Sequence, residues 1–256
     1  MIRAGGATAS RALGIAGKMG TLDASDGLTD LRAVHALRGP AQNMRGEGHV
    51  AVTVQMPTDT PWTAALAFDA TDDAAARAAH GALARGFSAV RQAYIAGWQG
   101  WCGALDSLNG QATNLYYMSL MVIKAHEDKT NRGAIIASIS TPWGQHVPDD
   151  NDVPGYRRVW ARDLFHAASA LLAAGDRATA EEALRFLDRT QQLASGSFPQ
   201  NSYVDGRPFL TATQMDQVAA PILLAWNLDA VDRYGSLVKP AAEYIYAHGP
   251  KTEQDG

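Results

Sequence analysis

The sequence contains little cysteine, no long run of one charge and no long apolar run. Cys102 is the only cysteine among the 256 residues, which excludes an intrachain disulfide and a cysteine-based metal cage. The formal net charge of -4 is not concentrated in one stretch, so we expect no nucleic-acid partner and no membrane partner. No stretch approaches the ~20 apolar residues of a membrane-spanning helix. The apolar run 12–17 is too short for a signal-peptide core, so the sequence assigns no compartment.

Short motifs that carry common chemistries are missing too. There is no Walker-type loop, GxSxG elbow or GxGxxG fingerprint, so nucleotide binding and serine hydrolase chemistry are unsupported and no cofactor is expected. His126-Glu127-Asp128 lacks the spacing of a zinc site and is interpreted as a solvated helix end. Residues 149–152 lack the central glycine and closing glutamate of a calcium loop, which favours a solvated acidic loop. We therefore predict no metal site.

The residues that are present change in pattern near residue 70. Hydrophobic residues make up 46% of the chain, enough for one sizeable core. Residues 49–56 alternate valine or methionine with small or polar neighbours, as half-buried strands do, and residues 64–68 favour another strand. Turn-forming residues lie at 25–27 and 38–40. The first 70 residues are therefore predicted to hold strands.

From Thr71 onward the spacing becomes helical. Thr71-Asp72-Asp73 predicts an N-cap that opens a run towards Gly97. Gly175 predicts the end of one helix, and Asp176 predicts the cap of the next. Other helices are predicted over residues 112–128, 160–174, 214–229 and 237–248. Short connections between them indicate antiparallel hairpins, with long loops such as 130–156 on the side where sites usually lie.

The segment from Tyr156 to Leu164 brings an aromatic ring, a guanidinium and a carboxylate to the point where a loop enters a helix. A pyranose has an apolar face that stacks on Trp or Tyr, and its hydroxyl groups accept from a guanidinium and donate to a carboxylate. The segment therefore indicates sugar binding. The alternative is that Arg162 and Asp163 form only a local pair, with Asp163 stabilising the helix start.

A second candidate is the loop over residues 196–206. Phe198 and Tyr203 offer stacking faces, and Gln200 and Asn201 offer amides. The alternative is an ordinary ordered loop with a buried aromatic residue. Because the two candidate segments follow successive hairpins, they are predicted to open on the same edge.

Taken together, these segments resemble glycoside hydrolase family 15, the glucoamylases and glucodextranases, over nearly the whole chain. The matching segments are SDGLTDL at 25–31, HEDKTNRGAIIASISTPWG at 126–144, GYRRVWARDL at 155–164, GSFPQNSYVDGRPF at 196–209 and QMDQVAAPILLAW at 214–226. Several long motifs in the same order make the resemblance specific.

The resemblance implies a mainly α fold: the first half of an (α/α)6 barrel of antiparallel helix hairpins, preceded by the last few strands of a β-sandwich. The implied domains are residues 1–70 as the sandwich remnant, 71–110 as a linker helix region and 111–256 as the half-barrel. In that family an Arg-Asp pair at the start of the second barrel helix grips the terminal glucose at the non-reducing end. The substrate-binding residues implied here are Tyr156, Trp160, Arg162, Asp163, Phe198 and Gln200.

The two catalytic glutamates of the family have no match in this sequence. Inverting hydrolysis needs two carboxyl groups about 6.5–9.5 Å apart, one to protonate the leaving oxygen and one to activate water. In relatives a Trp-Glu-Glu motif with the general acid follows a segment like Gly249 to Gln254, and the general base lies much further along. We therefore expect a truncated chain with no catalytic residue of its own.

Two departures from the family pattern are visible. Gln217 stands where relatives usually have an acidic residue, and the basic pair Arg157-Arg158 replaces less charged neighbours. Both are expected to alter sugar binding.

The expected function is glucoamylase-type hydrolysis that releases glucose from non-reducing ends of α-glucans, α-1,4 or α-1,6, with this chain inactive by itself. The alternative is a non-catalytic sugar-binding or assembly-dependent protein, because half a toroid leaves apolar helix faces unburied. A homodimer is one way to cover them. A third reading is a gene fragment that folds poorly.

Overall fold

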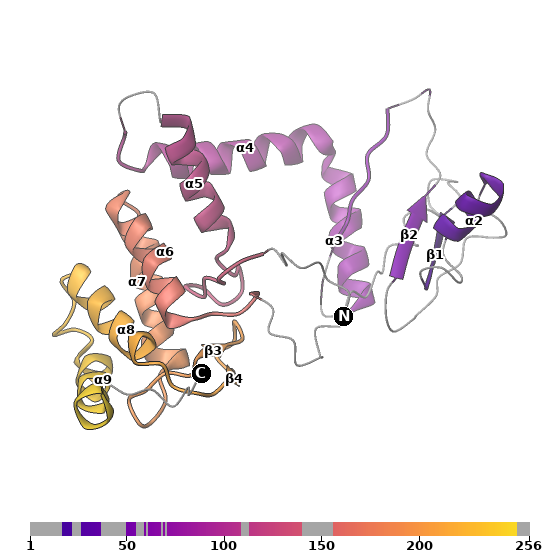
Figure 1. Cartoon of the computed structure of the whole chain (residues 1–256). Coiled ribbons are helices and arrows are strands. Elements are labelled where there is room, and N and C mark those ends of the chain that lie inside the picture. Colours follow the sequence, from indigo (N-terminus) through magenta and orange to yellow (C-terminus); the bar gives the residue numbers. More distant parts are fainter. Residues whose placement is uncertain are drawn as a thin grey trace. The chain divides into compact units, whose positions relative to one another are not determined.

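The computed structural model describes residues 17–21, 27–36, 50–54, 59, 61–67, 69, 71–108, 113–139 and 156–249. The chain divides into two compact units (Figure 1). Unit 1 contains residues 1–97 and 147–151, and unit 2 contains residues 98–146 and 152–256. The acidic run 149–152 lies outside the described residues.

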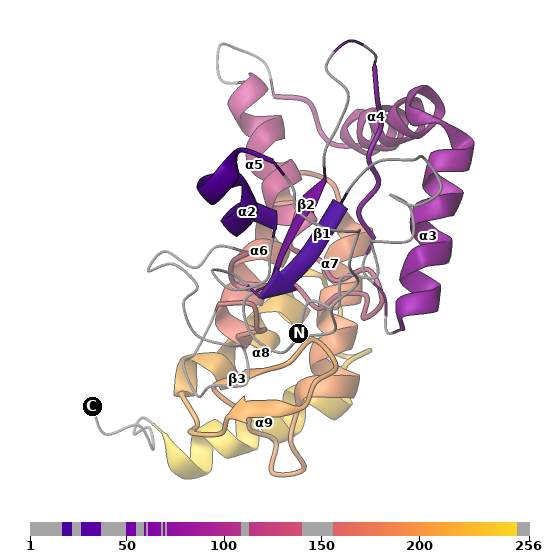
Figure 2. The ribbon, with the colours of Figure 1, turned by 90° about the vertical axis from the view of Figure 1, so that its right-hand side faces the viewer.

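Unit 1 contains a two-stranded antiparallel sheet with a helix beside it (Figure 2). Strand β1 (Gly17–Thr21) pairs with β2 (Val50–Val54), with Gly17 opposite Val54 and Thr21 opposite Val50. The strand predicted over 49–56 is confirmed for 50–54, and its other residues lie outside the described ones. Helix α2 (Gly27–Val34) contacts both strands and was not predicted, because its first residue belongs to a turn-forming tripeptide.

The strand predicted over residues 64–68 is wrong. Residues 64–67 form no strand, and Phe68 lies outside the described residues. Leu66 is 75% exposed, whereas a half-buried strand would turn this side chain to a core. Alternation over so few residues, mostly alanine, is a weak strand signal because alanine has low β-propensity.

The helical run after Thr71 begins as predicted but is two helices. The Thr71 hydroxyl accepts a hydrogen bond from the amide of Ala74 at 3.2 Å and so caps α3 (Asp72–Arg85). Gly86 then adopts φ +78°, a conformation that favours glycine, and α4 (Phe87–Gly103) follows. A single helix to Gly97 was expected because the alanine-rich spacing continues across the break.

Unit 2 is mainly helical, as predicted. Its elements are α5 (Thr113–Ala125), α6 (Ala161–Ala173), α7 (Arg177–Phe186), the π-helical turn η1 (Leu187–Gln191), β3 (Asn201–Ser202), β4 (Pro208–Leu210), α8 (Met215–Asn227) and α9 (Gly235–His248). Helix α6 packs against α5, α7 and α8, and α8 packs against α9. Fully buried leucines from these helices, such as Leu164, Leu184, Leu224 and Leu237, form the core between them.

The turn between α6 and α7 follows its sequence signals. Gly175 has φ +92° after the last turn of α6. The Asp176 carboxylate accepts from the amide of Thr179 at 3.1 Å and caps α7. Because only three residues separate the two packed helices, they form the predicted antiparallel hairpin.

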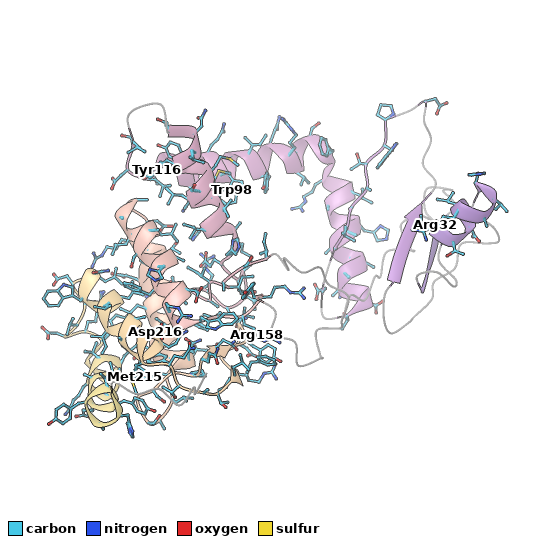
Figure 3. All side chains as sticks on the ribbon, viewed as in Figure 1. Arg32, Trp98, Tyr116, Arg158, Met215 and Asp216 are labelled. Atoms are coloured by element: carbon cyan, nitrogen blue, oxygen red, sulfur yellow. The ribbon has the colours of Figure 1, made fainter. Side chains whose placement is uncertain are left out.

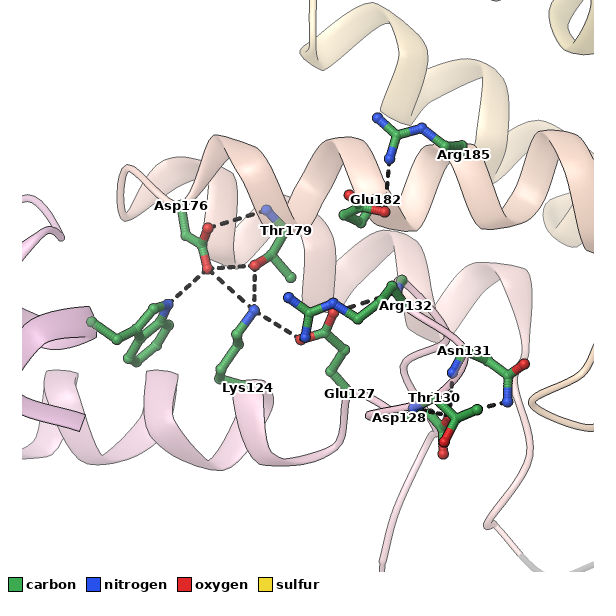
Figure 4. Close-up of polar contacts among 12 residues, drawn as sticks. Lys124, Glu127, Asp128, Thr130, Asn131, Arg132, Asp176, Thr179, Glu182 and Arg185 are labelled. Carbon is green, nitrogen blue, oxygen red and sulfur yellow. Dashed lines mark hydrogen bonds and ion pairs between the residues drawn. The ribbon is translucent and has the colours of Figure 1, made fainter. Parts of the chain in front are cut away.

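The interpretation of His126-Glu127-Asp128 as a solvated helix end is wrong for Glu127, which is 3% exposed. Figure 4 shows its contact with Lys124. Its carboxylate lies 2.8 Å from Lys124 Nζ. The same ammonium group donates to the Thr179 hydroxyl at 2.5 Å. These contacts compensate the cost of burying the charges and join α5 to α7.

Candidate functional site

The loop that enters α6 is fixed to strand β3 by a short ladder. The amide of Val159 donates to the carbonyl of Ser202 at 2.9 Å, and the reverse bond is 3.0 Å. From the π-helical turn, the Gln191 amide group donates to the Val159 carbonyl at 2.8 Å and to the Ser202 hydroxyl at 2.9 Å. The residues on either side of Val159 are therefore held in place before α6 begins.

Arg158 strengthens this attachment. Its guanidinium lies 3.6 Å from the ring centre of Phe209 and 5.0 Å from that of Tyr203, and the residue is 6% exposed. Figure 3 labels the side chain of Arg158. A guanidinium over an aromatic face is stabilised by the ring quadrupole. Arg158 thus holds the β3–β4 hairpin against the loop, and its expected effect on sugar binding stays a prediction.

Two aromatic rings flank the start of α6. Trp160 is the N-cap residue of the helix and is 8% exposed. Tyr156 is 40% exposed, and its ring centre lies 6.1 Å from that of Trp160 at an interplanar angle of 59°. Two of the predicted residues are therefore neighbours, with Tyr156 the more accessible ring.

Arg162 lies between two carboxylates. Its Nη1 forms an ion pair with Asp216 Oδ2 on α8, and its Nε lies 3.8 Å from Asp163 Oδ2. All three side chains are between about a third and a half exposed. Ion pairs this exposed contribute ~0–1 kcal/mol to stability, so folding alone gives little reason for the arrangement.

The backbone of Arg162 is held by the next residue of α8. The amide of Arg162 donates to Gln217 Oε1 at 2.8 Å, and Gln217 is fully buried. Asp216 and Gln217 thus contact the side chain and the backbone of the same arginine.

The remaining two predicted residues differ in their surroundings. Phe198 is fully buried in the hydrophobic core and offers no face to a ligand, which agrees with the alternative of a buried loop aromatic. Gln200 is half-buried, just before β3. Because β3 runs antiparallel to the loop at Val159, the chain at Gln200 is directed towards the first residues of α6.

Sequence reasoning missed Asp216. It lies in the segment Gln214–Gln217, of which the sequence singles out only Gln217, as a departure from the family. The available signal was its place at the start of a predicted helix, as Asp163 is at the start of another. The contact itself depends on α6 and α8 packing side by side, which no spacing within either helix reveals.

The cluster formed by Tyr156, Trp160, Arg162, Asp163 and Asp216 combines what a sugar requires. An aromatic face can stack on the pyranose ring, the guanidinium can donate, and the carboxylates can accept from hydroxyl groups. Among the described residues, no group of three His, Cys, Asp or Glu side chains is arranged to hold a metal ion. Within the same part of the chain, no helix is long and apolar enough to cross a membrane.

Two family models match the chain in succession. The model of glucodextranase domain N matches residues 6–103, and that of glycosyl hydrolases family 15 matches residues 110–196.

Three curated relatives share parts of the sequence. A glucoamylase of Clostridium sp. (strain G0005) is 38% identical over 237 residues, which cover 93% of this chain and 34% of the relative. An uncharacterized glycosyl hydrolase of Methanocaldococcus jannaschii is 35% identical over 36% of this chain and 16% of its own length. Trehalase 2 of Sulfolobus acidocaldarius is 40% identical over 37% of this chain and 16% of its own.

A solved structure matches the fold as well. The crystal structure of a bacterial glucoamylase complexed with acarbose superimposes with a TM-score of 0.77 at 36% sequence identity. The match covers 93% of this chain and 35% of that one, so the chain spans about a third of the length of these glucoamylases.

Proposed function

Because this chain belongs to glycoside hydrolase family 15, the family of glucoamylases and glucodextranases, we propose that it binds the terminal glucose unit of an α-glucan at the start of α6. The observation that carries the proposal is the placement of Arg162 between the carboxylates of Asp163 and Asp216, beside Trp160 and Tyr156. Arg162 and Asp163 grip the hydroxyl groups, and the two rings line the site. Gln200 belongs to its wall, and Phe198 supports that wall from the core.

For a longer protein that contains this part, the proposed activity is inverting hydrolysis that releases glucose from non-reducing ends. The 256 residues have no counterpart of the Trp-Glu-Glu motif. Without a general acid and base, proton transfers each contributing ~100- to 10,000-fold are lost. This chain by itself is therefore proposed to bind sugar without useful turnover.

The binding proposal is tested with acarbose, the ligand in the matching crystal structure. We expect isothermal titration calorimetry to detect binding, and Arg162→Ala to weaken it by ~10- to 100-fold, because hydrogen bonds to charged groups contribute ~1.5–3 kcal/mol. Arg207→Ala is the matched control, since Arg207 also pairs with an exposed carboxylate, Asp205, at 3.0 Å. Equal affinity of all three proteins would show that Arg162 does not bind the sugar.

Turnover is measured separately as glucose release from maltotriose and isomaltotriose. We expect no release above the buffer rate from the purified chain. Robust hydrolysis would contradict the assignment of binding alone.

The identity of the disaccharide linkage is a separate matter. The similarity to a trehalase over part of the chain makes trehalose a second candidate ligand. Competition of trehalose, maltose and isomaltose against acarbose ranks the three linkages directly.

A second candidate function is that of an assembly-dependent protein. Leu115, Met118 and Val122 recur at helical spacing on α5 and are 71%, 57% and 53% exposed. A row of exposed apolar side chains favours association with another protein surface.

A further inference from the structure

Helix α6 begins without a capping bond from the side chain of its N-cap residue. The first amides of a helix have no partner within the helix, and a Ser, Thr, Asp or Asn at the N-cap usually accepts from one of them. The N-cap residue here is Trp160, which makes no side-chain capping bond. An indole offers only a donor, so it cannot accept from an amide. The acceptor for the second residue of the helix must come from elsewhere.

That acceptor is Gln217 of α8. The amide of Arg162 can only donate, so the Gln217 atom at 2.8 Å is its carbonyl oxygen. The amide nitrogen of Gln217 then points to Gln214 Oε1 at 3.2 Å. With both ends bonded inside a fully buried side chain, Gln217 has a fixed orientation.

Asp216 holds the guanidinium of Arg162, and Gln217 holds its backbone amide. We infer that Gln217 is a positioning residue for the sugar site: it caps α6 from a neighbouring helix and so fixes the direction of Arg162 and Asp163, without touching the sugar itself. This inference rests on the proposed function. In this inference, the contact between α6 and α8 determines how the Arg162 guanidinium lies relative to the carboxylates of Asp163 and Asp216.

The chemistry requires an oxygen at this position and not a particular charge. A glutamate would still accept from the Arg162 amide. It would give up the donor to Gln214 and change the charge of the group formed with Arg162, Asp163 and Asp216 from about -1 to -2. A methionine has a similar shape but no strong acceptor, so it leaves the amide of Arg162 without its partner.

The test compares acarbose binding by wild type, Gln217→Met and Gln217→Glu. We expect Gln217→Met to bind ~10-fold more weakly or worse, because Arg162 loses the acceptor that fixes it and each hydrogen bond to a charged group that is then weakened contributes ~1.5–3 kcal/mol. Gln217→Glu is expected to bind more tightly than Gln217→Met, since the acceptor remains, but below wild type, since the added charge is buried and the donor to Gln214 is lost. Leu237→Ala is the control for stability, because Leu237 is fully buried on α9 away from the cluster. It should lower thermal stability while leaving the affinity unchanged.

A second readout observes the cap directly. Selective 15N-arginine labelling allows hydrogen exchange of the Arg162 amide to be followed by NMR. We expect slow exchange in wild type and Gln217→Glu, and fast exchange in Gln217→Met. Should Gln217→Met fail to fold, fast exchange of this amide in wild type overturns the inference.

The outcomes separate the two proposals. Wild type that does not bind acarbose overturns the proposed function and this inference together. Wild type that binds, with Gln217→Met binding equally well, overturns the inference alone. The same holds if Leu237→Ala loses as much affinity as Gln217→Met, because the loss then follows global stability.

Discussion

Asp176 shows how a single residue of this protein is given several partners. Burial raises the pKa of its carboxyl group. Hydrogen bonds from Thr179 and from the indole of Trp101, the latter at 2.9 Å, lower this pKa, and so does the charge of Lys124. Together they lower it by more than burial raises it. The net result is a pKa below the ordinary value of 3.8. The folded state therefore prefers the ionised form.

Replacing this carboxylate should reduce stability in a pH-dependent way. A lowered pKa contributes stability that is complete above the unfolded value and is lost as the pH falls through the folded value. We expect Asp176→Asn to lower the free energy of unfolding by ~1–3 kcal/mol near pH 7, where donors lose their charged acceptor. The deficit should shrink as the pH falls below 3.8. Urea unfolding at several pH values measures both, and a deficit independent of pH would contradict the ionised form as the stabilising one.

At this scale, the sequence predicted what depends on chain neighbours. The caps at Thr71 and Asp176 are confirmed because the acceptor and the amide are three residues apart. The burial of Glu127 was missed because its surroundings form only in the fold: its partner Lys124 also donates to Thr179 of α7, and its carboxylate accepts from the amide of Gly133.

Among the elements, the turn after α5 depends on one glycine. Gly133 has φ +83°, and a Cβ atom there would lie 2.1 Å from the backbone carbonyl oxygen of Glu182 on α7. Backbone atoms of a packed helix cannot move aside cheaply, and a positive φ strains any side chain. The turn and α7 therefore approach each other only because position 133 has no side chain.

Substitution at this turn is predicted to be costly. Gly133→Ala should lower the free energy of unfolding by at least about 2 kcal/mol. Gly100→Ala provides the contrast, because Gly100 lies within α4 with nothing within 4 Å of an added Cβ. There, alanine should stabilise by ~0.5–1 kcal/mol through its helix propensity. Denaturant unfolding of both variants checks the opposite signs, and a neutral Gly133→Ala would refute the close approach.

Elements with strong periodicity were the ones predicted correctly. Helices α6 and α8 lie within a residue or two of the expected ranges, because their apolar spacing extends over several turns. The break at Gly86 and the absence of a strand at residues 64–67 were not anticipated. Both depend on local conformation and burial that a few small residues specify weakly.

At the scale of the whole molecule, the exposed stripe Leu115–Met118–Val122 on α5 is the feature that bears on assembly. A homodimer was predicted because a half-barrel leaves apolar helix faces unburied. If the stripe is the contact, self-association should depend on it.

Introducing a charge into the stripe should therefore reduce association. We expect light scattering to show dimers of wild type that increase with concentration, and Met118→Lys to be monomeric over the same range, because burying an unpaired ammonium group costs several kcal/mol. Ala242→Lys is the control, since Ala242 is exposed on α9 and not on α5. A monomeric wild type at all concentrations, or equal association of both variants, would exclude this contact.

The sequence by itself determined the family, the caps of α3 and α7 and the chemistry of the predicted sugar site. Each of these depends on residues close together in the chain, whose spacing is fixed by covalent geometry. The tertiary structure alone decided that Asp216 pairs with Arg162, 54 residues before it, that Gln217 caps α6, and that Phe198 is buried. Those contacts arise where α6 packs against α8 and where the loop before β3 meets the core, and side-chain partners across such surfaces depend on how the helices pack.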